Sequence, residues 1–132
     1  RWLSADVLAD RLSQSGVSRA RGFSLNTANF HTTEEQIGFG EAVSGMTNGA
    51  HYVIDTSRNG AGPAATSELD WCNPGGRAMG TAPTTATAGE HADAYLWVKR
   101  PGESDGSCRS GEPPAGRFVS EYAIELVRNA GS

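Results

Sequence analysis

The chain has 132 residues, a formal net charge of −4 and a sequence pI of about 5.3, which suits one modest acidic domain. Its basic residues form no stripe, so nucleic acid is not a predicted partner. No apolar run approaches the ~20 residues of a membrane-spanning helix, so no membrane partner is predicted either. The chain begins with Arg1 rather than Met and shows no signal peptide, which favours a processed or truncated chain.

Helix and strand signals alternate along the chain. Ser4 can cap a first helix that Gly16 ends, and Thr32 followed by Glu35 forms a capping box that opens a second one. Short apolar runs between turn residues indicate strands. In chain order the predicted elements are a helix over residues 4–14, a strand over 22–26, a helix over 32–46, strands over 51–55 and 94–98, and a helix over 118–128.

These elements predict an α/β fold whose three short strands are parallel. Three strands cannot close a barrel, and a complete (β/α) barrel needs roughly 250 residues. We therefore expect the chain to be part of such a barrel, with an apolar outer edge of the sheet that another segment would cover.

A long loop follows the second strand, from Thr56 to about Gly80, and carries Trp71 and Cys72. Loops of this length without regular structure are usually functional or disordered, and we expect this one to be ordered and functional. A bridge between Cys72 and Cys108 would restrict the unfolded chain by roughly 4 kcal/mol and indicate an oxidising, secreted setting; two free buried thiols are the alternative. Two cysteines without histidines at ligand spacing predict no zinc or other metal site.

Polar side chains follow each predicted strand. Because the carboxyl ends of parallel strands meet at the same edge of a sheet, we expect these groups to lie together. With Trp71 in the intervening loop they suit a sugar site, since an indole stacks on the apolar face of a pyranose and polar groups bind its hydroxyls. The groups are Asn26, Thr27 and Asn29 after the first strand, Asp55, Arg58 and Asn59 after the second, and Lys99, Glu103 and Asp105 after the third.

Several of these residues also have a purely structural interpretation. Asp55 could cap a turn, Arg58 could pair with a carboxylate rather than bind a ligand, and Trp71 could belong to the core. Glu103 and Asp105 could form a solvated acidic turn. The histidines lack a nearby Ser or Cys in a nucleophile pattern, so we interpret them as structural or surface residues: His31, His51 and His91.

Four longer motifs occur in a fixed order. They are Gly22–Phe30 (GFSLNTANF), Val53–Gly60 (VIDTSRNG), Trp71–Pro74 (WCNP) and Trp97–Gly106 (WVKRPGESDG). In these motifs the chain resembles the C-terminal half of the catalytic domain of glycoside hydrolase family 6, the inverting cellulases. The resemblance covers nearly the whole chain.

The resemblance implies a fold, a reaction and partners. The fold would be a distorted seven-stranded (β/α) TIM-like barrel, with residues 1–132 as the C-terminal portion of one catalytic domain and the N-terminal portion absent. The reaction would be the hydrolysis of β-1,4-glucosidic bonds in cellulose with inversion. The partners would be cellulose or β-glucan oligosaccharides and the N-terminal half of the same domain. No cofactor is implied, and the expected location is secreted and extracellular.

The resemblance also assigns roles to charged residues. Asp105 matches the proposed catalytic base, which could act on water directly or through a chain of waters. Arg58 matches an arginine that pairs with this base, and Asp55 in the same motif is expected to support it. Arg58 and Lys99 would favour the ionised form of Asp105, as a base requires. The general acid of the family lies earlier in the domain and no segment here matches it, so we expect the isolated chain to be inactive.

Further residues match contacts to the sugar. Lys99 and Glu103 match residues that bind the glucosyl unit next to the scissile bond. Trp71 matches a stacking tryptophan of a glycone-side subsite, and Asn29 matches an amide that contacts substrate.

The loops bear on the mode of action. Exo-acting members of the family cover the cleft with long loops, one of them after the base, whereas only residues 106–117 separate Asp105 from the last predicted helix. Short loops imply an open cleft and an endoglucanase. The alternatives are an exo-acting cellobiohydrolase, a non-catalytic glucan-binding remnant and a structural fragment without a ligand. The resemblance also implies that Cys72 and Cys108 form a disulfide.

Overall fold

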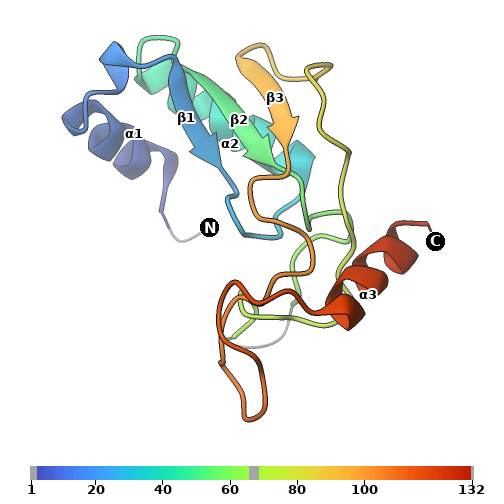
Figure 1. The fold of residues 1–132 in the computed structure, drawn as a ribbon. Coiled ribbons are helices and arrows are strands. Elements are labelled where there is room, and N and C mark those ends of the chain that lie inside the picture. The colour runs from blue at the N-terminus through green and yellow to red at the C-terminus, as the bar shows by residue number, and fades with distance from the viewer. Residues whose placement is uncertain (1–2, 66–68, 132) are drawn as a thin grey trace.

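The computed structural model describes residues 3–65 and 69–131. Figure 1 shows the elements, and each predicted helix and strand has a counterpart among them. The short 3-10 helix η1 was not predicted. In chain order the elements are α1 (Ala5–Gln14), η1 (Val17–Arg19), β1 (Gly22–Leu25), α2 (Thr33–Met46), β2 (His51–Asp55), β3 (Ala92–Leu96) and α3 (Ser120–Ala130).

The strands form one parallel sheet in the order β1-β2-β3, as the sequence predicts. The helices α1 and α2 pack against one face of this sheet, and Figure 1 shows α2 behind it. The arrangement is α/β, with a core built from both helices and all three strands. That core comprises Ala9, Leu25, Phe39, Val43, Tyr52, Ile54, Ala92 and Tyr95.

The other face of the sheet lacks such a layer. Side chains alternate between the faces of a strand, so Ser24, Val53 and Leu96 point away from the core. Ser24 is exposed, Val53 is half-buried and Leu96 is 38% exposed. Parallel sheets are normally covered on both faces. Within the described residues, therefore, only one face of this sheet has its helical cover.

The two edges of the sheet also differ. On the outer edge of β3, Thr84 forms an antiparallel bridge to Tyr95, in which each backbone N–H donates to the other residue's carbonyl at 3.0 and 2.9 Å. Across the described chain β1 is paired with β2 alone. The sheet thus has one blocked edge and one free edge.

Two helix boundaries follow the predicted chemistry. The Thr32 hydroxyl accepts a hydrogen bond from the Glu35 backbone N–H at 3.2 Å, which confirms the N-terminal cap of α2. Gly16 follows α1 with a φ of +89°, a left-handed conformation that glycine adopts without a steric penalty. None of the helices in the described ranges has the length and apolar character that a membrane span requires.

Two other boundaries differ from the prediction. The strand predicted over 94–98 is Ala92–Leu96, because its bounds are set by backbone pairing with β2, from Tyr52–Ala92 to Asp55–Leu96, which an apolar run does not reveal. The helix predicted over 118–128 is Ser120–Ala130. Phe118 lies before it, 61% exposed, with its backbone bridged to Glu103.

Candidate active site

The segments that follow the three strands meet at one end of the sheet, towards which the strand arrows point in Figure 1. Asp55, the last residue of β2, joins them. Its fully buried carboxylate accepts backbone N–H groups from Ala28 at 2.9 Å, Ser57 at 2.9 Å and Lys99 at 3.0 Å. One side chain therefore fixes the loops after β1, β2 and β3. Its link to Asp105 passes through Lys99, and no direct contact joins the two carboxylates in the described structure.

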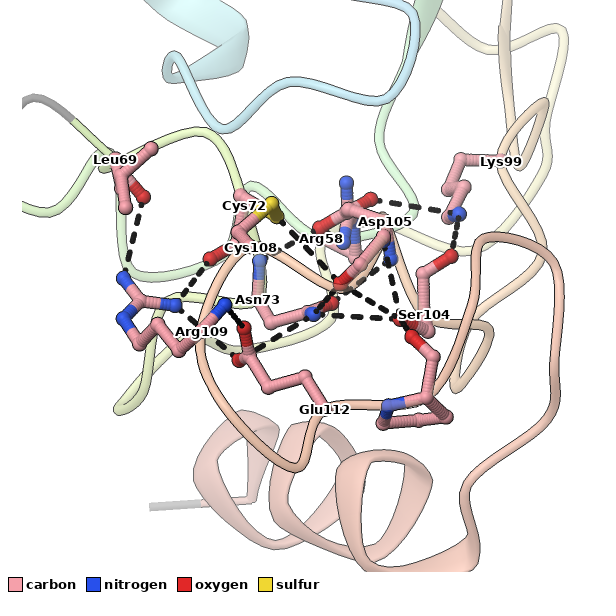
Figure 2. Close-up of a disulfide and its surroundings, with 12 residues drawn as sticks. Arg58, Leu69, Cys72, Asn73, Lys99, Ser104, Asp105, Cys108, Arg109 and Glu112 are labelled. Carbon is pink, nitrogen blue, oxygen red and sulfur yellow. Dashed lines mark hydrogen bonds and ion pairs between the residues drawn. A yellow bond between two sulfur atoms is a disulfide. The ribbon is translucent and has the colours of Figure 1, made fainter.

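Asp105 lies in this region between two cations (Figure 2). Its Oδ2 is 2.7 Å from Arg58 Nη1, and its Oδ1 is 3.4 Å from Lys99 Nζ. The side chains of Asp105 and Arg58 are each only 6% exposed. The two cations supply the opposite charge that a nearly buried carboxylate needs as compensation.

Arg58 is held on several sides. Its Nη2 donates to the Ala28 carbonyl at 2.6 Å, and its guanidinium lies over the Phe30 ring, 4.3 Å from the ring centre. Both Nη atoms and one face of the guanidinium are thus engaged. The interpretation of Arg58 as an ion-pair partner rather than a free ligand agrees with these contacts.

Asn73 also contacts Asp105, although its motif alone did not identify it as a site residue. Its backbone N–H donates to Asp105 Oδ2 at 2.9 Å, and its side-chain Oδ1 accepts the Asp105 backbone N–H at 2.8 Å. Its Nδ2 donates to the Gly106 carbonyl at 2.9 Å. An asparagine between Cys72 and Pro74 was the available signal, because asparagine adopts positive φ more readily than most residues, and φ here is +47°.

The loop around Asp105 is tied at further points. Ser104 is fully buried, and its hydroxyl donates to the Pro113 carbonyl at 2.8 Å. A disulfide joins Cys72 to Cys108, as the resemblance implied (Figure 2). The Trp71 loop and the Asp105 loop are therefore linked both covalently and by hydrogen bonds.

The predicted sugar contacts occupy different settings. Trp71 is 51% exposed and precedes Cys72. Lys99 Nζ also donates to the Ser104 carbonyl at 3.2 Å, whereas Glu103 lies 3.4 Å from exposed Arg100. The structure thus groups Lys99 with Asp105 and leaves half of the Trp71 surface exposed.

Asn29 is turned inward within its own loop. Its Oδ1 accepts the Phe30 backbone N–H at 2.8 Å, and its side chain lines a surface pocket with Leu25 and His31. A different pocket adjoins the Asp105 cluster, and Arg58, Asn73 and Glu103 contribute to its walls.

Histidine–carboxylate pairs lie at the opposite end of the strands. His91 Nδ1 is 2.7 Å from Glu41 Oε1, and the other Glu41 oxygen accepts the Tyr52 hydroxyl at 2.7 Å. The hydrogen bond to Glu41 raises the pKa of His91. Burial opposes ionisation of Glu41, but the hydrogen bonds from His91 and Tyr52 outweigh it and lower the pKa of Glu41 overall.

Asp93 forms a second such pair. Its carboxylate is 2.8 Å from both Arg21 Nε and His51 Nδ1, and the hydrogen bond from Arg21, with further help from His51, lowers the pKa of Asp93 to about 2. Glu41, Glu90 and His91 place possible metal ligand atoms within 4.8 Å of one another. Because the Glu41 oxygens already accept hydrogen bonds from His91 and Tyr52, ion pairing accounts for this cluster.

Comparison with known proteins agrees with the site geometry. The model of the family described as "Glycosyl hydrolases family 6" matches residues 2–130. The chain belongs to glycosyl hydrolase family 6. It is 48% identical over 130 residues to Endoglucanase A of Cellulomonas fimi, a match that covers 98% of this chain and 28% of that protein.

A solved family 6 structure is closer in sequence. The endoglucanase Cel6 from Mycobacterium tuberculosis, in complex with methyl-cellobiosyl-4-deoxy-4-thio-β-D-cellobioside, matches with 72% identity and a TM-score of 0.98. That match covers 100% of this chain and 45% of the Cel6 chain. A probable 1,4-β-D-glucan cellobiohydrolase C of Aspergillus terreus is 37% identical over 98 residues, covering 61% of this chain and 21% of that protein. The chain thus spans less than half the length of each of these relatives.

Proposed function

We propose that this chain is the C-terminal portion of a secreted family 6 catalytic domain that hydrolyses β-1,4-glucosidic bonds in cellulose with inversion. The observation that carries the proposal is Asp105, a nearly fully buried carboxylate between Arg58 and Lys99 in a chain of this family. An inverting enzyme needs one carboxylate that stays ionised to activate water. We infer that Asp105, between its two cations, is that carboxylate.

The reaction divides between the two portions of the domain. Asp105 accepts a proton from the attacking water, directly or through further waters, while the exposed Trp71 indole stacks on a sugar ring and Lys99, Glu103 and Asn29 bind hydroxyls. A second carboxyl group protonates the leaving oxygen. In inverting enzymes the two carboxyl groups lie about 6.5–9.5 Å apart. The N-terminal half supplies this acid.

The sheet supports an N-terminal partner of that kind. One face has no helical cover in the described chain, and β1 has a free edge. Strands from the N-terminal half would pair with β1 and complete a distorted seven-stranded (β/α) barrel. The second face of the sheet would then line the interior of that barrel and be covered there. The Cys72–Cys108 disulfide supports secretion, because such bonds persist in oxidising compartments.

The decisive experiment uses the longer protein in which this chain follows its N-terminal half. Asp105→Asn should lower kcat on a soluble β-glucan by about 10²–10⁴-fold, the usual contribution of a general base, and leave KM close to its original value. The first product anomer, followed by NMR, should be α. Unchanged kcat, or a β anomer as first product, contradicts the proposal. The isolated 132-residue chain should show no Asp105-dependent hydrolysis.

Endo action is the expected mode. The endoglucanase structure is 72% identical to this chain with a TM-score of 0.98, whereas solved cellobiohydrolase structures of the family match 96% of it at only 26–28% identity. The viscosity of carboxymethylcellulose should fall out of proportion to the reducing ends released. Cellobiose as the sole early product would instead indicate an exo-acting cellobiohydrolase.

A non-catalytic glucan-binding remnant is the second candidate. Trp71 favours it, because this exposed indole can bind a sugar without any acid. Calorimetry of the 132-residue chain with cellotetraose should then show weak binding that Trp71→Ala abolishes. Phe118→Ala, which changes another exposed aromatic residue, serves as the control and should leave binding intact. If the chain shows no measurable binding to cellotetraose, the result favours the remaining alternative, a structural fragment without a ligand.

A further inference from the structure

We propose that Asn73 is a positioning residue that fixes the orientation of the Asp105 carboxylate and makes Oδ1 its proton-accepting oxygen. The inference rests on the proposed role of Asp105 as the base. Asn73 acts through Asp105 and is assigned no contact with substrate. Its contacts come from the Trp71 loop, so the base is held by a segment distant from it in the sequence (Figure 2).

The contacts between the two residues are reciprocal. The backbone N–H of Asn73 donates to the Asp105 side chain at 2.9 Å, and the side chain of Asn73 accepts the Asp105 backbone N–H at 2.8 Å. The amide of the same side chain donates to the Gly106 carbonyl at 2.9 Å, one residue beyond the base. Main chain and side chain of Asp105 are therefore fixed by the same residue.

The two oxygens of Asp105 become unequal as a result. Oδ2 has two close donors, Arg58 Nη1 at 2.7 Å and the Asn73 N–H at 2.9 Å. Oδ1 faces Lys99 Nζ at the longer distance of 3.4 Å. The oxygen with the weaker contact has more capacity to accept a proton, so Oδ1 is the atom that faces the water.

The backbone of Asn73 suits this role and supplies a clean test. Its φ of +47° is left-handed, a conformation that glycine also adopts easily. Asn73→Gly therefore keeps the backbone N–H and removes the side-chain bonds, which are those to the Asp105 N–H and the Gly106 carbonyl and two longer ones to Ser104 and Glu112. Asn48, exposed after α2 with a φ of +59°, offers a matched control, because Asn48→Gly makes the same change far from the base.

In the longer protein we expect Asn73→Gly to lower kcat by about 10–100-fold, the scale of a misplaced catalytic group, with KM changed less than about twofold. The acidic limb of the pH–rate profile should move to higher pH, because a carboxylate that is no longer held in place lies less closely against Arg58 Nη1 and the Asn73 N–H, the two donors to its Oδ2. Asn73→Asp keeps the acceptor for the Asp105 N–H but adds a like charge, so it should move the limb further. Asn48→Gly should leave both kcat and the limb in place.

A second measurement does not depend on hydrolysis. In the 132-residue chain, the carboxyl carbon of Asp105 is titrated by ¹³C NMR in the original sequence, in Asn73→Gly and in Asn48→Gly. A titration midpoint that rises in Asn73→Gly but not in Asn48→Gly supports the positioning role. An inactive longer protein would refute the catalytic proposal alone and would leave this result standing. A titration midpoint that Asn73→Gly leaves unchanged overturns the role of Asn73. So does a loss of activity that parallels a loss of stability while the acidic limb of the pH–rate profile stays in place.

Discussion

At the scale of single residues, Arg58 and Asp105 are buried as a pair, and each depends on the other for compensation of its charge. The buried Asp55 carboxylate is compensated by backbone groups instead, since three N–H donors from three loops converge on it. The residues after the strands are thus arranged for chemistry by contacts that fix main chain as well as side chains.

Arg58→Ala should lower the free energy of unfolding by about 3–5 kcal/mol, because it leaves the Asp105 charge buried without its closest cation. Urea unfolding of the chain measures this change. The double variant Arg58→Ala with Asp105→Asn should lose less than the sum of the two single variants. Additive losses would contradict a coupled pair.

The sequence indicated this cluster only in part. Arg58 and Asp105 follow predicted parallel strands, so topology alone places them at one end of the sheet. Asn73 lies in a loop without regular structure, where no periodicity predicts which neighbour a backbone N–H will meet. Asp55 was expected to support the base, but its three backbone donors depend on how three loops close, which a local sequence pattern does not specify.

At the scale of elements, the helix α2 and the strand β2 meet at a close approach. A Cβ added at Gly40 would lie 2.6 Å from the ring of Tyr52, whereas one added at Gly45 would meet nothing within 4 Å. Both glycines lie inside α2. Packing therefore requires glycine at position 40 of this helix but not at position 45.

Gly40→Ala should lower the free energy of unfolding by about 1–3 kcal/mol, since Tyr52 must shift to admit the methyl group. Gly45→Ala should raise it by about 0.5–1 kcal/mol, because alanine favours the helix and has room. Chemical denaturation of the two variants side by side tests the pair. Shifts of the same sign would show that helix propensity, not packing, governs both positions.

Element types were easier to predict than element ends. Capping at Thr32 and the turn at Gly16 are local, and both occur as expected. The start of β3 depends on the pairing of Ala92 with Tyr52 of the neighbouring strand, so the apolar run alone placed the strand two residues too late.

At the scale of the whole molecule, ionisable groups cluster at both ends of the strands, and those at the amino end govern how stability responds to pH. Asp93 and Glu41 have lowered pKa values, so their contributions are complete above the ordinary carboxyl range and are lost as pH falls. His91 has a raised pKa, so its contribution is complete below its ordinary value and is lost as pH rises through the folded-state value.

Stability arising from these groups should therefore be greatest between about pH 5 and 6.5, above the ordinary carboxyl values and not above the ordinary histidine value. Urea midpoints measured from pH 3 to pH 9 test this. His91→Asn should flatten the decline on the alkaline side and Asp93→Asn the decline on the acidic side. If the alkaline decline in stability persists unchanged in His91→Asn, groups other than His91 cause it.

The bridge between Thr84 and Tyr95 has a consequence for self-association. With Tyr95 on the outer edge of β3 bridged, β1 is the strand that the described chain leaves unpaired on one side, and two copies can join their sheets there, antiparallel about a two-fold axis. That contact uses both available edges and stops at a dimer. A sheet open on both sides could instead add copies without limit, as in fibrous aggregates, so one short bridge in a loop sets an upper bound on edge-to-edge polymerisation.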